Sequence, residues 1–293
     1  MFSFLKKSIL ILLCSNVLFA CIQDVIINES PENREMVLNC ILNTQKDTVF
    51  VQLSYSKPIQ EIVEFEPIVD AEIQLFEDGE KIGDFLWVDS SAYSLPFTVL
   101  PGKKYRIEAK KGNNKVWAET SVPSIADATI DKSTFANGSY MVSLNHNPEN
   151  SDFYWISAKG YEGSADNKTL NIACELYSNF EYADDFNRRI YENGIYKFEY
   201  VYYIRFTENE LTTNQTEVVF YPQCINSPIE VFLLSVDYHL DKYMKSSLLF
   251  KDMDMYAQDM PVIYAPFPMY SNIHGGTGIF GSYSSVSKVF TKN

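Results

Sequence analysis

Histidine and cysteine, which supply many catalytic nucleophiles, bases and metal ligands, are scarce in this chain of 293 residues. The only histidines are His146, His239 and His274, which lie far apart in the sequence, whereas a zinc site needs three or four ligands. No G-x-S-x-G sequence occurs, and no cysteine forms a recognisable catalytic pair with a histidine. The sequence therefore predicts no catalytic residue, no metal ion and no cofactor, and we expect that the protein is not an enzyme.

Basic residues are also few, since 24 Lys and Arg stand against 38 Asp and Glu, for a formal net charge of −14. An acidic surface repels phosphate groups, so the composition argues against nucleic acid and against anionic lipid headgroups as partners. The composition also argues against disorder, because 46% of the residues are hydrophobic, enough to form buried cores.

The first 20 residues have the pattern of a secretory signal peptide: Lys6 and Lys7 precede an almost wholly apolar run, residues 8–20. This run is shorter than the roughly 20 apolar residues that span a bilayer. Leu18-Phe19-Ala20-Cys21 resembles the lipobox of bacterial lipoproteins, which predicts cleavage before Cys21 and lipidation of that residue. The alternative is an ordinary signal peptide, or an uncleaved anchor, with a cysteine there by chance.

Lipidation at Cys21 would attach the protein to a membrane, since several buried acyl chains give stable anchoring. Residues 21–35 are then a polar tether. Because no Asp directly follows Cys21, the resemblance to bacterial lipoproteins implies transfer to the outer membrane, on its periplasmic side or on the cell surface.

Three cysteines remain if Cys14 leaves with the signal peptide and Cys21 carries lipid. An odd number permits at most one internal disulfide. Cys174 and Cys224 lie in the same half of the chain and are the candidate pair, which would leave Cys40 as a free thiol. The alternative is that these cysteines are small buried thiols.

Alternating apolar and polar residues predict an all-β fold. In residues 48–55 the alternation has a period of two, and Asp78-Gly79 is typical of a hairpin turn. We expect an N-terminal immunoglobulin-like β-sandwich over residues 36–124, because short strands and turns follow one another closely there. The strands are expected at 36–42, 48–55, 71–75, 81–88, 105–110 and 116–122.

Residues 125–293 predict a second β-rich domain with one or two short helices. Residues 238–256 carry apolar side chains at helical spacing, and Asp237 can cap the start of that helix. Strands are expected at 139–144, 153–158, 170–176, 196–206, 217–221, 229–237 and 282–290.

Two local patterns resemble known sites but lack essential parts. Residues 276–281 match G-x-G-x-x-G, yet too few residues follow for the helix and acidic residue of a dinucleotide site. These glycines are better explained by positive φ angles or close backbone packing before a final strand. Asp252-Met253-Asp254 with Asp259 could hold calcium, but the Gly and the terminal Glu of a hand-type loop are missing, which favours a solvated acidic turn.

The closing region, from Pro268 to Ser284, carries a family resemblance. Ser271-Asn272-Ile273 followed by Gly278-Ile279-Phe280-Gly281 resembles the end of a Bacteroidota lipoprotein family known as domain of unknown function family 4249. The resemblance implies an outer-membrane or periplasm-facing lipoprotein, often encoded beside TonB-dependent receptors. It brings no catalytic residues with it.

Two functional hypotheses follow. The first is a non-enzymatic cell-envelope lipoprotein that is an accessory or binding partner of an outer-membrane TonB-dependent receptor, a β-barrel protein. The alternative is an extracellular glycan-binding module or hydrolase, because carboxylates are plentiful and residues 196–203 and 264–283 contain aromatic side chains that could stack on sugars.

Overall fold

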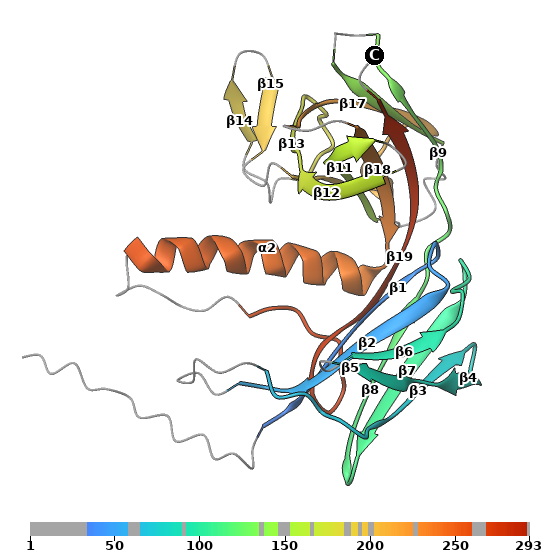
Figure 1. Cartoon of the computed structure of the whole chain (residues 1–293). Coiled ribbons are helices and arrows are strands. Elements are labelled where there is room, and N and C mark those ends of the chain that lie inside the picture. Colours follow the sequence, from blue (N-terminus) through green and yellow to red (C-terminus); the bar gives the residue numbers. More distant parts are fainter. Residues whose placement is uncertain are drawn as a thin grey trace, which may run out of the picture. The chain divides into compact units, whose positions relative to one another are not determined.

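The computed structural model describes residues 34–57, 65–89, 92–134, 138–145, 153–164, 167–184, 189–192, 195–198, 202–224, 228–259 and 268–291. The predicted signal peptide, the predicted lipidation site Cys21 and nearly all of the predicted tether lie outside these residues. Strands dominate the described part of the chain, and the predicted all-β class is confirmed (Figure 1).

The largest sheet contains strands from both halves of the chain. Its strands are β1 (Met36–Asn43), β2 (Thr48–Tyr55), β5 (Leu86–Asp89), β6 (Ala92–Pro96), β11 (Phe153–Ser164), β12 (Asn167–Ala173), β16 (Ile204–Thr207), β18 (Ile229–Val236) and β19 (Thr277–Phe290). The spatial order is β12-β11-β18-β19-β1-β2-β6-β5, and β16 also pairs with β11.

Two smaller sheets complete the fold. The first contains β3 (Glu72–Glu77), β4 (Glu80–Asp84), β7 (Lys104–Lys111) and β8 (Asn114–Ser121), in the order β4-β3-β7-β8. The second contains β9 (Asp127–Lys132), β10 (Tyr140–Asn145), β13 (Glu175–Ser178), β14 (Arg189–Glu192), β15 (Ile195–Phe198) and β17 (Gln215–Gln223), in the order β14-β15-β13-β17-β10-β9.

Each smaller sheet shares a hydrophobic core with part of the largest sheet, which gives two sandwiches. Leu38 of β1 and Ile107 of β7 belong to one core. Ile156 of β11 and Phe220 of β17 belong to the other. The alternation of side chains along each strand explains this arrangement, because it places the apolar set of each sheet on one face.

One helix, α2 (Tyr238–Asp259), follows β18 directly, close to the predicted range of 238–256. Asp237 caps its start as predicted, since the carboxylate Oδ1 accepts a hydrogen bond from the backbone N–H of Leu240 at 2.9 Å. A short 3₁₀ helix, η2 (Glu208–Glu210), follows β16.

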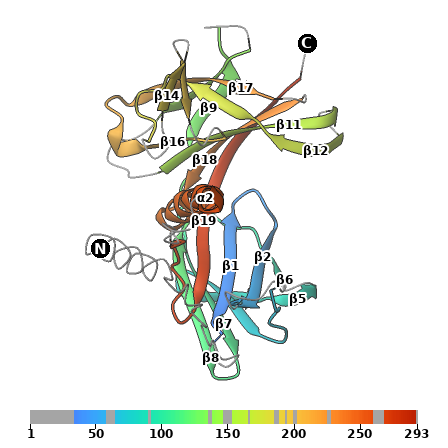
Figure 2. The ribbon, with the colours of Figure 1, turned by 90° about the vertical axis from the view of Figure 1, so that its left-hand side faces the viewer.

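The strand β19 belongs to both sandwiches. Its first half pairs in parallel with β1, from Val37↔Thr277 to Asn43↔Tyr283. Its second half pairs antiparallel with β18, and the register ends at Ile229↔Phe290. Figure 2 shows β19 lying beside β1 and running on towards β18. The last strand therefore completes the sheet of the first half, which no local pattern in the sequence predicts.

Glycines allow the first half of β19 to lie close to its neighbours. A Cβ atom on Gly278 would lie 2.1 Å from the carbonyl oxygen of Leu38, and the φ angle of Gly278 is +117°. A Cβ atom on Gly281 would lie 2.9 Å from Cβ of Leu240, which is in the first turn of α2. The predicted role of these glycines, positive φ or close backbone packing, is confirmed for Gly278 and Gly281, but both lie inside the last strand, which begins at Thr277 and not at the expected residue 282.

Some predicted strands are divided in the structure. Residues 196–206 were expected to form one strand, but β15 lies in the sheet of β13 and β17 whereas β16 pairs with β11. Residues 170–176 are likewise shared between β12 and β13, with Cys174 between them. In both cases one apolar run serves two sheets, so hydrophobicity alone did not reveal the break.

Replacing Gly278 with alanine should destabilise the fold by about 3 kcal/mol or more, since the new Cβ clashes with backbone and the φ angle is unfavourable. Urea unfolding measures the effect. Gly79→Ala is the control, because Gly79 also has a positive φ but open space at its Cβ position, and should cost about 1–2 kcal/mol. Equal losses in the two variants would contradict the close approach of β19 to β1.

Candidate functional site

The structure joins Cys174 and Cys224, the candidate pair, in a disulfide. The bond lies next to the Glu175↔Gln223 pair, so it holds β13 against the end of β17. Cys40 is a free thiol in the core of the first sandwich, where burial raises its pKa. A thiol that is buried and protonated is poorly suited to nucleophilic chemistry.

The two histidines that the structure describes, His239 and His274, have different contacts. The Nδ1 atom of His239 lies 2.7 Å from the hydroxyl oxygen of Tyr270. The ring of His274 stacks on the ring of Trp117, with centroids 4.0 Å apart. His146 and the side chains of Asp252, Asp254 and Asp259 lie outside the described residues. Within the described part of the chain, no three His, Cys, Asp or Glu side chains are grouped as metal ligands would be.

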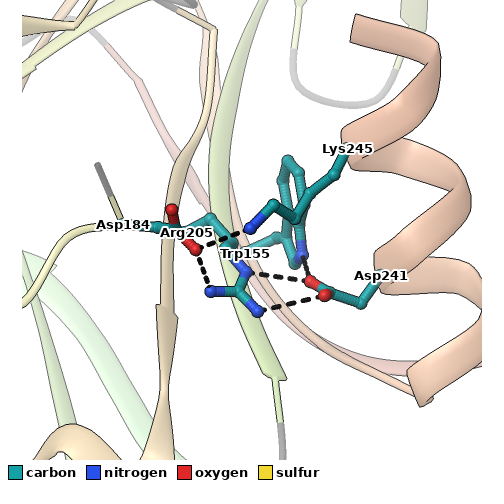
Figure 3. Close-up of polar contacts among 5 residues, drawn as sticks. All are labelled: Trp155, Asp184, Arg205, Asp241 and Lys245. Atoms are coloured by element: carbon teal, nitrogen blue, oxygen red, sulfur yellow. Dashed lines mark hydrogen bonds and ion pairs between the residues drawn. The ribbon is translucent and has the colours of Figure 1, made fainter. Parts of the chain in front are cut away.

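A group of polar and charged side chains joins α2 to β11, to β16 and to the segment that follows β13 (Figure 3). Arg205 of β16 donates two hydrogen bonds to Asp241 of α2, from Nε to Oδ1 at 2.9 Å and from Nη2 to Oδ2 at 3.0 Å. The indole N–H of Trp155 also donates to Asp241, at 2.9 Å. Asp184 accepts from Arg205 and from Lys245, so two carboxylates face two cations. We call these five residues the Arg205 cluster.

The Arg205 cluster is too well paired to be an open catalytic site. The Arg205 side chain is 5% exposed and that of Asp241 is 0% exposed, and each charge is met by an opposite charge at hydrogen-bond distance. A buried charge is tolerated only when it is paired and hydrogen-bonded, as here. The bidentate geometry fixes the position of α2 relative to β16.

A second polar contact, around Asp237, joins the two halves of the chain. Its carboxylate accepts hydrogen bonds from the Thr120 hydroxyl of β8 and from the Ser282 backbone N–H of β19. Burial raises the pKa of Asp237, although the hydrogen bonds from Thr120, Ser282 and Leu240 act in the opposite direction. One carboxylate thus contacts β8, β19 and α2.

A pocket of about 380 Å³ opens where β13 and β17 separate. The two strands pair only as far as Ser178↔Phe220. Beyond that point, residues 179–182 form one wall of the pocket, and the loop and strand over residues 212–219 form the other. The hydroxyls of Tyr182 and Thr212 lie 3.4 Å apart and connect the two walls.

Polar side chains dominate the lining of this pocket. Its described lining residues are Asn179, Phe180, Glu181, Tyr182, Thr212, Thr213, Gln215, Thr216, Glu217 and Val219. Among the residues that the structure describes, no Lys, Arg or His lines the pocket. The described part of the lining can donate and accept hydrogen bonds.

An exposed apolar strip crosses the first sandwich on the outer face of its sheet. Phe50 of β2 and Leu86 of β5 are 56% and 69% exposed, and both lie opposite Ser94 of β6. Ile41 and Val88 are also exposed, on β1 and β5. We call Ile41, Phe50, Leu86 and Val88 the apolar strip. Among the described strands β5 pairs only with β6, so the strip ends at the edge of the sheet as far as the structure describes it.

Sequence reasoning found the disulfide pair and the cap residue Asp237, but it missed the Arg205 cluster, the pocket and the strip. Arg205 lies in β16, Asp241 in α2 and Asp184 in the segment after β13, and no spacing in the sequence relates them. The one available signal was an arginine, Arg205, between the apolar residues Ile204 and Phe206 of a predicted strand. Such a charge in a buried strand requires a partner.

Comparison with solved structures gives distant likenesses. A two-domain fibronectin type-III segment from chicken tenascin is 11% identical, covers 89% of this chain and 100% of its own, and has a TM-score of 0.21. A putative membrane anchored protein from Corynebacterium diphtheriae is 10% identical, with coverages of 70% and 55% and a TM-score of 0.20. The collagen binding domain of Erysipelothrix rhusiopathiae surface protein RspB is 11% identical, with coverages of 86% and 97% and a TM-score of 0.18. Scores this low support no conclusion about function.

No curated protein matches the chain significantly. The model of the family described as "Domain of unknown function (DUF4249)" matches residues 23–289. Among the helices that the structure describes, none has the length and apolar character needed to span a membrane.

Replacing Arg205 with methionine should destabilise the fold by about 3–5 kcal/mol, because Asp241 is left buried without its cationic partner. The free energy of unfolding in urea measures this loss. Lys288→Met is the matched control, since it removes an ion pair with Asp131 that is about half exposed, and it should have a much smaller effect. A similar loss in both variants would contradict the structural role of the Arg205 cluster.

Asp237→Asn should change how stability depends on pH. Because the pKa of Asp237 is raised in the folded state, the folded protein binds this proton more tightly than the unfolded chain does. The contribution of Asp237 is therefore fully present below its unfolded pKa of about 3.9 and is lost as the pH rises through its folded pKa. We expect the stability of wild type relative to Asp237→Asn to fall with rising pH in this range.

The control for this experiment is Asp78→Asn. Hydrogen bonding to Lys103 lowers the pKa of Asp78, so its contribution is present above the unfolded pKa and is lost as the pH falls. The stability of wild type relative to each variant, measured by urea unfolding, should therefore change with pH in opposite directions across the acidic range: it should fall with rising pH for Asp237→Asn and rise with pH for Asp78→Asn. A wild-type advantage over Asp237→Asn that grows with pH would contradict the burial of this carboxylate.

Proposed function

We propose that this chain, which belongs to the DUF4249 family, is a lipid-anchored cell-envelope protein that binds a partner protein and catalyses no reaction. The proposed partner is an outer-membrane β-barrel of the TonB-dependent receptor class. The observation that carries the proposal is the apolar strip at the edge of the sheet as far as the structure describes it.

The anchor is supported by the N-terminal sequence. Leu18-Phe19-Ala20-Cys21 follows a basic and then apolar segment, in the register expected for a lipoprotein signal. Acyl chains on Cys21 would each add about 0.8 kcal/mol per buried methylene, which makes attachment independent of headgroup charge. Independence from charge suits a chain whose net charge is −14.

A binding role, as opposed to a catalytic one, is supported by the pairing of buried charged side chains with other groups of the protein. Arg205 is engaged by Asp241 and Asp184, and the carboxylate of Asp237 is engaged by the cap of α2 and by β19. These groups hold structural elements together and are occupied by one another. A catalytic acid or base needs a position from which it reaches a substrate.

A protein partner fits the apolar strip better than a small molecule does. Native edge strands are usually protected by charged residues or proline, whereas β5 presents Leu86, Trp87 and Val88. An open edge can accept an additional strand, with main-chain hydrogen bonds giving affinity and side chains giving specificity. Asp89 follows directly and the surface is acidic, so a partner segment with basic residues would complement it.

The test is a pull-down of the natural lipidated protein, tagged at its C-terminus, from outer membranes of its host. Wild type should recover a β-barrel receptor, and Leu86→Lys should reduce the recovery by about tenfold, because it places a charge at the centre of the contact. Leu100→Lys is the control: Leu100 is also exposed but precedes β7 and is not part of the strip.

Two outcomes would overturn this proposal. If no β-barrel is recovered with wild type, or if Leu86→Lys recovers as much as Leu100→Lys, the strip does not bind the proposed partner. Mass spectrometry of the N-terminal peptide of the same preparation tests the anchor separately. An unmodified Cys21, or a different first residue, would refute lipid attachment even if a partner binds.

A further inference from the structure

We infer that the pocket beside the first half of β17 binds a short extended peptide, which pairs with β17 as an additional antiparallel strand. The pocket lies in the second sandwich, whereas the proposed partner surface lies on β1, β2 and β5 of the first. The inference is therefore independent of the proposed function, and either can fail without the other.

The strand β13 is shorter than the strand with which it pairs. It ends at Ser178, opposite Phe220, whereas β17 begins further back, at Gln215. After Ser178 the chain leaves the sheet, and residues 179–182 form the far wall of the pocket. The pocket of about 380 Å³ therefore lies where β13 would run if it continued beside β17, and its volume is within the range of sites for small ligands.

The backbone of β17 presents a donor and an acceptor to this pocket. The Ser178 hydroxyl donates to the carbonyl of Val219 at 2.7 Å, so that carbonyl points to the β13 side. In an antiparallel ladder the N–H and carbonyl of one residue point to the same side, and every second residue shares that side. The N–H and carbonyl of Glu217 therefore point into the pocket. The opposite edge of β17 pairs with β10 throughout residues 215–220.

Glu217 lies between two residues whose carbonyls are already bonded. The carbonyl of Val219 accepts from Ser178, and the carbonyl of Gln215 accepts from the Thr213 hydroxyl at 2.6 Å. Within the residues that the structure describes, no strand pairs with Glu217 on the β13 side. A peptide residue opposite Glu217 can exchange two hydrogen bonds with it, as residues of a hydrogen-bonded antiparallel pair do.

An extended peptide matches this pattern because it carries the same two groups with the same spacing. In strand addition, main-chain hydrogen bonds give affinity, and pockets for alternate side chains give specificity. The match depends on the direction of backbone groups in β17. It does not depend on the charges of the side chains that line the pocket.

The alternation along β17 sets which side chains the peptide needs. Thr216 and Val218 are buried and point to the core, whereas Glu217 is exposed. Side chains directly opposite one another in a ladder lie on the same face of the sheet. Peptide residues opposite Thr216 and Val218 therefore point to the core side, where Phe180 belongs to both the core and the pocket lining, and they should be apolar. The peptide residue between them faces solvent and should be polar.

The Arg205 cluster keeps the far wall of the pocket in place. Phe180 packs on the buried ring of Phe206, next to Arg205, with centroids 5.2 Å apart. The backbone N–H of Asp184 donates to the Arg205 carbonyl at 2.8 Å, and the Asp184 side chain pairs with Arg205. Residues 179–184 are thus tied to β16 and α2, and a wall held in this way loses little entropy when a ligand binds.

The test is a titration of the full mature chain, labelled for amide NMR, with capped pentapeptides. The first probe is acetyl-Ser-Val-Thr-Val-Ser-amide, whose valines point to the core side when its threonine lies opposite Glu217. Two further probes carry leucine or phenylalanine in place of both valines. We expect at least one probe to bind, and its binding to shift the Glu217 amide proton and slow its exchange with solvent, because that N–H gains an acceptor.

A methylated peptide tests the pairing without any change to the protein. N-methylation of the central threonine removes the donor for the Glu217 carbonyl and leaves the side chains as they were. The methylated form of the best probe should bind at least about tenfold more weakly than the unmethylated form.

Two substitutions of Glu217 separate backbone from side chain in the protein. Glu217→Pro removes the N–H that points into the pocket, and a strand tolerates proline where the N–H is not part of a ladder. It should weaken binding at least about tenfold. Glu217→Ala is the matched control, because it removes the carboxylate but keeps the N–H, and it should bind within about twofold of wild type. Circular dichroism and thermal unfolding establish that each variant is folded.

The inference is overturned if no probe binds, if a bound probe leaves the amides of residues 215–219 unchanged, or if the methylated and unmethylated peptides bind equally. Glu217→Ala losing as much affinity as folded Glu217→Pro would also overturn it, because the side chain and not the backbone would then hold the ligand. Should Glu217→Pro fail to fold, the methylated peptide decides on the wild-type protein.

Discussion

The hydrogen bonding of β19 to β1 on one side and to β18 on the other is the constraint on which the rest of the structure depends. It makes one continuous sheet out of strands from both halves of the chain. The contact is possible only because Gly278 and Gly281 lack side chains where the backbone of β1 and the start of α2 approach. A local choice of residue thus controls a long-range arrangement.

Buried polar groups reinforce this arrangement at two points. Asp237 holds the start of α2 against β19 and also accepts from Thr120 of β8. Further along the helix, Asp241 binds Arg205 of β16. Both carboxylates are hydrogen-bonded to donors, because an unpaired polar group is costly in the low-dielectric interior. Together they place α2 and the segment 179–184, and with that segment the wall of the polar pocket.

Much of the fold could be predicted because it depends on local alternation. β2 and the start of α2 fall where the periodicity placed them, and Asp78-Gly79 forms the expected turn with positive φ at both residues. The pocket could not be predicted, because it exists where β13 stops pairing with β17 and its walls come from separate segments. The apolar strip could not be predicted either, since apolar residues such as Phe50 and Leu86 are common in strands and their exposure depends on which strands lie beside them.

The amino-acid sequence by itself determined the all-β class, the position of the helix and the cap at Asp237, because these depend on contacts between residues near one another in the chain. Only the tertiary structure decided that β19 joins the first sandwich, that Arg205 meets Asp241, and that a polar pocket opens beside β17. Those features depend on which distant strands pair, and pairing is set by the combined burial of whole faces, which no single segment encodes.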